Sequence, residues 1–383
     1  MNYDLDIVRD EKDIARYFYV TYEIESSVSV FDAAFCIASG QSIGNPSKRS
    51  VWETADMIEN HCCKIIRNSK FENKRGLIEI GFPIANIDFD TDGISQLLCM
   101  IMGGQTDIDT IKKCRVIGLD MPKHIVESFF KLPRYGIKGI REYTSTFGKP
   151  LFGGIVKPKT GITPNQLLDM TKQLVDGGVN FIKEDEILGN PHICRLQDRV
   201  EVISNYIQGR GVVYCFCINS DPLYIVDRAR FVSQNGGNGV HINFWSGFGA
   251  YKSIRDQNLN LFMHYQKSGV EVITHKKNNF GISWQVLCQL AAYCGVDTIH
   301  SGMWGGYLSS PEDELHATFN VLHKYNVLPA LSCGMTADLV KPIVEKFGVD
   351  WMANVGGAIH SDPGGTIVGA QKIRSAIDRL TSY

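Results

Sequence analysis

Two short charged clusters combine residue types that could carry out chemistry together. In LFGGIVKPKTG, Lys157 and Lys159 end an apolar run, and period-two alternation places both on one side, where they suit anionic substrate oxygens. In FIKEDE, Asp185 and Glu186 are adjacent carboxylates, which are hard oxygen ligands suited to Mg²⁺. Without a metal such crowding costs like-charge repulsion, so the alternative for the second cluster is a solvated acidic turn.

The segment from Pro150 onward has the pattern of a closed barrel. Strands that alternate with helices imply parallel βαβ units, and eight of them favour a (β/α)8 TIM barrel over an open sheet. The C-terminal strand ends form the mouth of such a barrel, and polar residues gather there in this chain. The alternative is that they are turn residues beside buried strands. The eight β-rich runs are LFGGIVKP, FIKEDE, VVYCFCIN, GVHINFW, LFMHYQ, TIHSG, LPALSCG and WMANVGG.

The first 140 residues indicate a separate α+β domain. ARYFYVTYEI, KRGLIEIGFP and CRVIGLDMP predict strands, whereas VWETADMIENHCCKIIRN and ISQLLCMIMG predict helices. The segment FFKLPRYGIKGIREYTSTFGKP, with its prolines and glycines, is expected to be a linker. The predicted class is α/β: a ferredoxin-like α+β domain over 1–140, followed by a barrel catalytic domain over 141–383.

Composition excludes several classes of protein. The 383 residues favour about two domains, and 44% hydrophobic with 21% charged residues is typical of a soluble globular protein. A net charge of −2 gives no general attraction to nucleic acid or to anionic membranes. No long apolar run predicts a membrane span, and the acidic N-terminus lacks the features of a signal peptide. Eleven cysteines without a CxxC pair are expected to be reduced thiols in a cytoplasmic protein.

The pattern GG-x-x-KPK-x-G, followed by GG-x-x-F-x-K-x-DE, resembles the RuBisCO large-chain superfamily in order and spacing. The similarity covers the whole C-terminal part and, more weakly, the N-terminal part. Several motifs in order are very specific for the superfamily and much less so for the reaction. Further similar stretches are YGIKGIREYTSTFGKPLFGG, VHINFWSGFGA, FMHYQKSG, IHSG, SCG and NVGGAIHSDPGGTIVGAQKIRSAID.

The resemblance implies a role for each charged residue. Lys183 matches the lysine that CO2 carbamylates, and with Asp185 and Glu186 it would bind Mg²⁺. Conversion of an ammonium into an anionic carbamate removes a repulsive cation and adds an oxygen ligand. Lys157 matches the lysine that assists proton transfer at the substrate carbon, and Lys159 matches a neighbour that contacts enediolate oxygens.

The resemblance also implies a site for a phosphorylated sugar. His300 and Ser332 match residues that contact one end of a sugar phosphate, and Lys267 could hold a phosphate there as a point charge. Glycine amides can approach an anion closely at the other end. The matching glycines are Gly334, Gly356 and Gly357.

Departures from the family pattern predict that this chain does not fix CO2. Carboxylating members carry a lysine where IHSGMWGGYL places Tyr307, and a His-Arg pair where this chain has Gln266 and Lys267. A glutamate and an asparagine of their N-terminal domain are replaced by Ser39 or Gly40 and by Gly104. Because carboxylation needs the added CO2 to be stabilised, these losses together indicate a non-fixing, form IV RuBisCO-like protein.

Three functions remain open at this point. The leading one is Mg²⁺-dependent enediolate chemistry on a ketose-type phosphate with an isomerase or enolase outcome, as in methylthioribulose phosphate salvage. The alternative is decarboxylation of a 3-oxo sugar-acid phosphate of the 3-oxo-isoapionate 4-phosphate type. A non-catalytic scaffold is the third. The resemblance also implies a homodimer or larger homo-oligomer, with the N-terminal domain of one subunit over the barrel mouth of another.

Other residues have less specific interpretations. His241 is expected to be a hydrogen-bonded barrel residue rather than a ligand. His360 could line the phosphate pocket or lie in a surface turn. Trp304 and Tyr307 could cover an apolar substrate tail or simply pack the loop. The run from His275 to Lys277 is expected to be a solvated turn.

Overall fold

The computed structural model describes residues 7–44, 48, 50–67 and 71–380. Contacts divide the chain into two compact units, Met1–Phe130 with Val270–Leu290, and Lys131–Gly269 with Ala291–Tyr383. The segment 270–290, from within the barrel part of the sequence, thus belongs to the N-terminal unit. None of the described helices is both long and apolar enough to cross a membrane.

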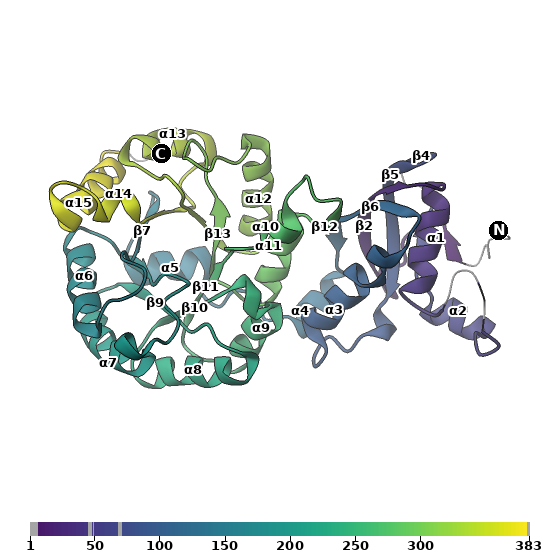
Figure 1. The fold of residues 1–383 in the computed structure, drawn as a ribbon, viewed down its shortest axis with the longest axis horizontal. Helices are drawn as coiled ribbons and strands as arrows, with labels where there is room; N and C mark the ends of the chain where they lie inside the picture. The colour runs from purple at the N-terminus through teal and green to yellow at the C-terminus, as the bar shows by residue number, and fades with distance from the viewer. Residues whose placement is uncertain (1–6, 45–47, 49, 68–70, 381–383) are drawn as a thin grey trace. The chain divides into compact units, whose positions relative to one another are not determined.

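The N-terminal unit is built on one sheet with the strand order β1-β3-β5-β2-β6-β12, and β4 pairs with β5 (Figure 1). The three predicted strands and the helix over ISQLLCMIMG are confirmed. The strands are β1 (Val8–Arg9), β2 (Tyr17–Ser26), β3 (Lys64–Ile66), β4 (Phe71–Glu72), β5 (Arg75–Pro83), β6 (Ile111–Asp120) and β12 (Phe280–Ile282). The helices are α1 (Val30–Gly40), α2 (Ala55–His61), η2 (Ile84–Asn86), α3 (Gly93–Met102), η3 (Gly104–Asp107), α4 (Lys123–Phe129) and α10 (Glu271–Thr274), and α11 (Trp284–Tyr293) follows β12.

The single helix predicted over VWETADMIENHCCKIIRN is wrong in its second half. Thr54 caps α2 by accepting a hydrogen bond from the Met57 N–H, and the helix ends at His61. Cys62 then takes an extended conformation, and the buried strand β3 pairs with β5. Tertiary pairing overrides the helical spacing here, because the β-branched isoleucines of β3 fit a buried sheet.

The N-terminal elements that were not anticipated from the sequence include α1 and β12. Helix α1 is capped by Ser29, whose hydroxyl accepts a hydrogen bond from the Asp32 N–H. Strand β12 runs parallel to β6, with Phe280 opposite Cys114. The predicted turn at His275–Lys277 is confirmed, since these residues are exposed and form a turn just before β12.

The second unit is a closed barrel of eight parallel strands, and all eight runs predicted as strands are confirmed (Figure 1). Around the barrel the order is β10-β11-β13-β14-β15-β7-β8-β9. Every strand end therefore points the same way, so the residues that follow the strands gather at one rim. The strands are β7 (Leu151–Ile155), β8 (Phe181–Lys183), β9 (Val213–Cys217), β10 (Gly239–Asn243), β11 (Phe262–Gln266), β13 (Thr298–Gly302), β14 (Leu328–Leu331) and β15 (Met352–Val355).

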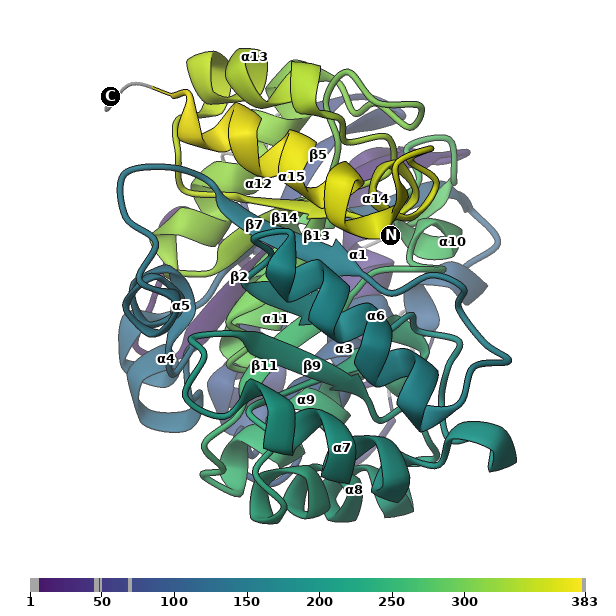
Figure 2. The same ribbon diagram turned by 90° about the vertical axis from the view of Figure 1, so that its left-hand side faces the viewer.

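Helices surround the barrel strands, and Figure 2 shows α6, α7 and α8 along the outside. The loop after β7 leads into α6 through a capping box, in which Thr163 and Gln166 satisfy each other's backbone N–H groups. The remaining bounds are α5 (Gly136–Thr144), α6 (Pro164–Asp176), η4 (His192–Cys194), α7 (Leu196–Ile207), α8 (Pro222–Gln234), η5 (Phe244–Ser246), α9 (Phe248–Asp256), α12 (Glu312–Lys324), α13 (Ala337–Phe347), α14 (Gly357–His360) and α15 (Gly365–Asp378).

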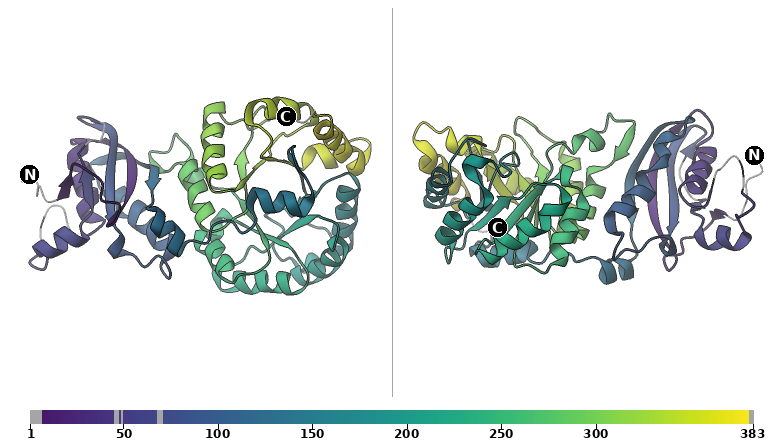
Figure 3. Two further views of the ribbon diagram at one scale, coloured as in Figure 1. Left: turned by 180° about the vertical axis from the view of Figure 1, so that it is seen from behind. Right: turned by 60° about the horizontal axis from the view of Figure 1, so that its bottom comes forward.

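The predicted linker is wrong in part, because it contains helix α5. The buried Ile140 of α5 packs into one apolar cluster with strand-start residues such as Leu151, Phe181 and Met352. Figure 3 shows α5 lying across the centre of the barrel ring. The helix therefore closes the N-terminal end of the barrel, and the opposite rim stays available for a site.

Candidate metal and substrate site

The two charged clusters predicted from the sequence lie together at the C-terminal rim of neighbouring strands. Lys157 Nζ lies 2.6 Å from Asp185 Oδ2, and Lys159 Nζ lies 4.0 Å from the same oxygen. Lys183 is the last residue of β8 and is fully buried, with its Nζ 3.1 Å from Glu186 Oε2. The acidic residues thus face lysines instead of forming a solvated turn.

Glu184, to which the sequence analysis gave no role, points away from this cluster. It is fully buried and pairs with the equally buried Arg199 of α7 at 2.9 Å and 3.0 Å. Arg199 also donates to the backbone oxygens of Gly189, Cys194 and Cys217. The pair therefore ties the loop after β8 to α7. Period-two alternation in Lys183-Glu184-Asp185 was the available signal that Glu184 faces the other side, and Glu186 breaks this alternation in the turn that follows.

Glu186 accepts more side-chain hydrogen bonds than Asp185 does. Its Oε2 accepts from Gln266 Nε2 at 2.6 Å, and its Oε1 accepts from Ser268 Oγ at 2.5 Å. Burial by itself would raise the pKa of Glu186, but the Lys183 ammonium and these hydrogen bonds hold it well below the usual range. Glu186 is therefore ionised, as a metal ligand must be.

The residues present fit a magnesium ion best if Lys183 contributes an oxygen beside the two carboxylates. Among the described residues, no group of three His, Cys, Asp or Glu side chains could hold a metal ion. Asp185 and Glu186 offer two carboxylates, and the Lys183 nitrogen lies beside the second. A carbamate on this nitrogen would supply a third anionic ligand, which Mg²⁺ prefers to an amine.

Three histidines fill the barrel interior near this site. His241 on β10, His264 on β11 and His300 on β13 are buried, and their rings lie edge to face. Burial lowers the pKa of each, and the nearby Lys183 lowers it further, so all three are neutral. The predicted hydrogen bonding of His241 is wrong: neither ring nitrogen of His241 or of His264 has a partner within the described part of the chain.

The residues expected at one phosphate end lie on adjacent strands. His300 Nε2 accepts a hydrogen bond from Asn354 Nδ2 at 2.8 Å, with the neutral tautomer inferred from this contact. Ser332 follows β14, and its backbone N–H donates to Gly302 O at the end of β13. Lys267 directly follows Gln266 at the end of β11. His300 and Ser332 are nearly buried, and thus shape the floor of the mouth.

The glycines expected at the other phosphate end lie in two places. A Cβ at Gly356 would stand 3.3 Å from Lys157 Cε, whereas one at Gly357 would meet open space. Gly334 has a φ of +107°, and a Cβ there would lie 2.6 Å from the Tyr307 nitrogen. The loop after β13 thus packs directly on the loop after β14, and only a residue without a side chain fits between them.

Aromatic and histidine side chains of these loops have distinct surroundings. Trp304 stacks under the Lys346 ammonium at 5.0 Å, so it packs its loop, whereas the Tyr307 side chain is 78% exposed. His360 Nε2 lies 3.1 Å from the Ile155 carbonyl oxygen, and His360 Nδ1 lies 3.2 Å from the Thr366 hydroxyl. The ring of His360 is thus bound to β7 and α15.

Within the N-terminal unit, the two departures noted in the sequence lie side by side. Gln41 follows Gly40, and its Oε1 accepts a hydrogen bond from the Gly104 N–H at 3.1 Å. Its Nε2 donates to Gln105 Oε1 at 2.9 Å. Ser39 is buried in α1. The Gln41 amide thus joins the end of α1 to η3.

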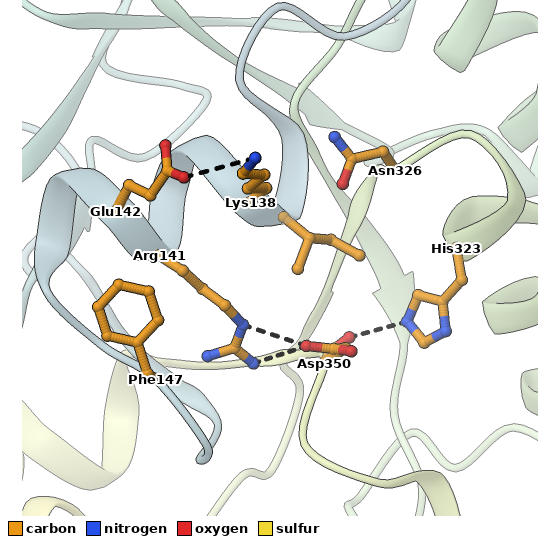
Figure 4. A pocket seen from close by; sticks show the side chains of 8 residues that line it. Lys138, Arg141, Glu142, Phe147, His323, Asn326 and Asp350 are labelled. Atoms are coloured by element: carbon orange, nitrogen blue, oxygen red, sulfur yellow. Dashed lines mark hydrogen bonds and ion pairs between the residues drawn. The ribbon is translucent and has the colours of Figure 1, made fainter.

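A pocket of about 440 Å³ lies at the N-terminal end of the barrel (Figure 4). Its charges are mutually satisfied: Arg141 donates twice to Asp350 Oδ1 and also to three backbone oxygens. None of the proposed site residues lines it, so we regard it as structural. The lining residues are Ile137, Lys138, Arg141, Glu142, Phe147, His323, Asn326 and Asp350.

Comparison with known proteins matches the chain to relatives over nearly its whole length. The chain is 28% identical to the ribulose bisphosphate carboxylase of Pyrococcus furiosus, over 98% of this chain and 90% of that protein. It is also 28% identical to the 3-oxo-isoapionate-4-phosphate decarboxylase of Rhizobium etli, over 93% and 91%. The octameric ribulose-1,5-bisphosphate carboxylase/oxygenase of Pyrococcus horikoshii OT3 superposes with a TM-score of 0.89 at 26% identity, over 98% of this chain and 90% of that one.

Family models cover nearly the whole chain. The model of the ribulose bisphosphate carboxylase large chain, catalytic domain, matches residues 136–382, and that of the N-terminal domain matches residues 2–125. Relatives named as a carboxylase and as a decarboxylase are equally identical to this chain, so identity alone does not select the reaction. The chain belongs to the ribulose bisphosphate carboxylase large-chain family, a family of enzymes.

Proposed function

We propose that this protein is a Mg²⁺-dependent enzyme that forms an enediolate on a phosphorylated ketose-type sugar, with an isomerase or enolase outcome. The observation that carries the proposal is the contact of Lys157 with Asp185 at 2.6 Å, beside the contact of Lys183 with Glu186 at 3.1 Å. A proton-carrying amine thus stands next to the group of metal ligands. Forming an enediolate requires both a base and a stabilised oxyanion.

Each residue has a role in this proposal. Lys183, as its carbamate, would hold Mg²⁺ together with Asp185 and Glu186, and the ion would act as a Lewis acid on substrate oxygens. Lys157, released from Asp185 and acting as a neutral amine, would take the proton from the carbon next to the carbonyl and become an ammonium. Lys159 would contact the enediolate oxygens.

The phosphate would be held at the rim of the same barrel. His300, Ser332 and Lys267 would bind one end of the substrate. The backbone N–H groups of Gly334, Gly356 and Gly357 would bind the other end. A phosphate site in the loops after the seventh and eighth strands is common in such barrels.

We infer that the protein does not fix CO2. Tyr307 stands where a carboxylase would need a cation, and a phenol cannot neutralise a new carboxylate as an ammonium can. Gln266 is already engaged with Glu186, so its amide is not available for the substrate. These features support a form IV, RuBisCO-like assignment within the family.

The second candidate is decarboxylation of a 3-oxo sugar-acid phosphate, favoured by the similarity to the Rhizobium etli decarboxylase. Loss of CO2 would generate the same enediolate without proton abstraction. The two functions therefore differ in their need for Lys157 as a base, which is where an experiment can separate them.

The test is the variant Lys157→Ala, with Lys172→Ala on the exposed side of α6 as its control. A methylthioribulose phosphate and 3-oxo-isoapionate 4-phosphate are supplied with Mg²⁺ and bicarbonate, and C–H exchange with D2O and CO2 release are measured. If proton abstraction starts the reaction, Lys157→Ala should lose exchange by a factor of about 10² or more. Retained CO2 release in that variant would favour the decarboxylase. Full isomerase activity would refute the assignment of Lys157.

A non-catalytic scaffold is the third candidate, and calorimetry with Mg²⁺ and bicarbonate tests it. Absence of metal binding in every condition would favour it. We further propose that the protein is cytoplasmic and forms a homodimer or larger homo-oligomer. Large apolar side chains exposed in the loops after β8, β10 and β13 support this, namely Ile187, Trp245 and Leu308.

A further inference from the structure

The carboxylate of Glu186 is held by two neutral side chains from the loop at the end of β11. Gln266 Nε2 donates to Oε2 at 2.6 Å, and Ser268 Oγ donates to Oε1 at 2.5 Å. Lys183 adds a charged contact to this carboxylate, at 3.1 Å. Each oxygen of Glu186 therefore has a dedicated neutral donor.

The orientation of the Gln266 amide is fixed by its other end. Its Oε1 accepts a hydrogen bond from the backbone N–H of Lys267 at 2.9 Å. A flipped amide would place an oxygen against Glu186 and an NH2 group against the Lys267 N–H, so both contacts would become repulsive. Because Gln266 is almost completely buried, it has no solvent alternative. The amide is thus a committed donor to Glu186.

A chain of hydrogen bonds connects Ser268 back to the Glu186 main chain. Asn219 Nδ2 donates to Glu186 O at 2.6 Å, and Asn219 Oδ1 accepts from the Asn243 N–H at 2.8 Å. Asn243 Nδ2 then donates to Ser268 O at 2.9 Å. This series of hydrogen bonds starts at the Glu186 carbonyl, passes the ends of β9, β10 and β11, and returns to the Glu186 carboxylate through the Ser268 hydroxyl. Both the backbone and the side chain of Glu186 are thereby fixed.

Asp185 is held in a different way. Its Oδ2 faces the ammonium groups of Lys157 and Lys159, and its Oδ1 accepts a long hydrogen bond of 3.4 Å from the Ile187 N–H. Cations compete directly with a metal ion for a carboxylate. Neutral donors do not, and a carboxylate has about four lone-pair sites, so they can remain in place beside a metal.

We propose that Gln266 and Ser268 are positioning residues that pre-orient Glu186 for Mg²⁺. The inference rests on the proposed function, because it takes Glu186 as a metal ligand. Partners that orient a metal ligand typically change metal affinity 10–100-fold when they are removed. The amide and the hydroxyl carry no charge at any ordinary pH, so this orientation is also independent of pH.

The test uses Gln266→Met, which keeps the length of the side chain and removes the donor, and Ser268→Ala. Ser268→Thr keeps the hydroxyl, and Gln173→Met on the exposed face of α6 is the matched control. Mg²⁺ binding is measured by calorimetry in bicarbonate buffer, and urea unfolding midpoints are measured in parallel. We expect the Kd for Mg²⁺ to rise about 10–100-fold in Gln266→Met and about tenfold in Ser268→Ala. Ser268→Thr and Gln173→Met should stay near the original protein.

Several outcomes would overturn the inference. Unchanged Kd values in Gln266→Met and Ser268→Ala would do so, as would a Ser268→Thr variant as weak as Ser268→Ala. A lower unfolding midpoint with an unchanged Kd would show a purely structural role. If the original protein binds no Mg²⁺ in bicarbonate, the proposed function fails first, and that result is distinct from all of these.

Discussion

Replacing Arg199 by Met should destabilise the protein strongly and loosen the loop that carries the proposed metal ligands. Arg199 is fully buried and donates to both oxygens of Glu184 and to three backbone carbonyls. Removing one partner of a buried ion pair typically costs about 3–5 kcal/mol, because the remaining charge is left without compensation. We expect a loss in that range for Arg199→Met.

A second change separates the charge effect from the loss of packing. Glu184 keeps donors from the Tyr214 hydroxyl at 3.2 Å and the Cys217 N–H at 2.7 Å, so a neutral Gln can still be accommodated there. The double variant Arg199→Met/Glu184→Gln should therefore recover about 1 kcal/mol or more of the loss, since no buried charge remains.

The assay is urea unfolding followed by circular dichroism, with Arg230→Met on α8 as the control. Arg230 is partly exposed and pairs only with nearby surface groups, so its loss should change stability by no more than about 0.5 kcal/mol. Mg²⁺ affinity in bicarbonate should fall in Arg199→Met and not in the control. An Arg199→Met variant as stable as Arg230→Met would refute the reasoning about the buried pair.

Three further predictions concern the pH dependence of stability, metal binding and Gly334 in the loop after β14. The pKa values of His241, His264 and His300 are lowered in the folded protein. Below the ordinary histidine pKa of about 6.5, the unfolded chain therefore binds more protons than the folded protein does. The contribution of these histidines to stability is complete above that pH and is lost as pH falls, by up to about 1.4 kcal/mol per pH unit for each histidine. The variant His264→Gln should therefore make the urea unfolding midpoint depend less steeply on pH. Mg²⁺ at 100 times its Kd should add about 2.7 kcal/mol to the free energy of unfolding in bicarbonate, and EDTA should remove it. Gly334→Ala should raise KM for a phosphorylated substrate while the fold persists, because its Cβ would press on the Tyr307 nitrogen at 2.6 Å; an unchanged KM would contradict this.

The barrel could be predicted from the sequence because each strand has a strong local pattern. Runs such as VVYCFCIN are apolar, β-rich and bounded by turns, and this property does not depend on distant residues. The gathering of Lys157 and Asp185 followed from the parallel topology, since all strand ends share one rim. The chemistry could thus be placed at this rim before any contact was known.

Features that depend on distant partners could not be predicted. The strand at Lys64–Ile66 has a helical spacing that its pairing with β1 and β5 overrides. The insertion of β12 beside β6 joins segments far apart in the chain. From the sequence, Gln266 indicated only the loss of a family residue. Its hydrogen bond to Glu186 could not be predicted, because the two residues follow different strands and meet across the barrel mouth. Among the described residues, no group forms a hydrogen bond with the ring nitrogens of His241, and this too depends on what the neighbouring strands place around them.

The most direct test of the central claim is whether Mg²⁺ binding depends on a carbamate at Lys183. Calorimetry with Mg²⁺, with and without bicarbonate, is combined with 13C NMR of the protein in 13C-bicarbonate, for the original chain and for Lys183→Met. The account predicts metal binding only with bicarbonate, together with a carbamate signal, and the loss of both in Lys183→Met. Equal Mg²⁺ binding without bicarbonate, or in Lys183→Met, would contradict it.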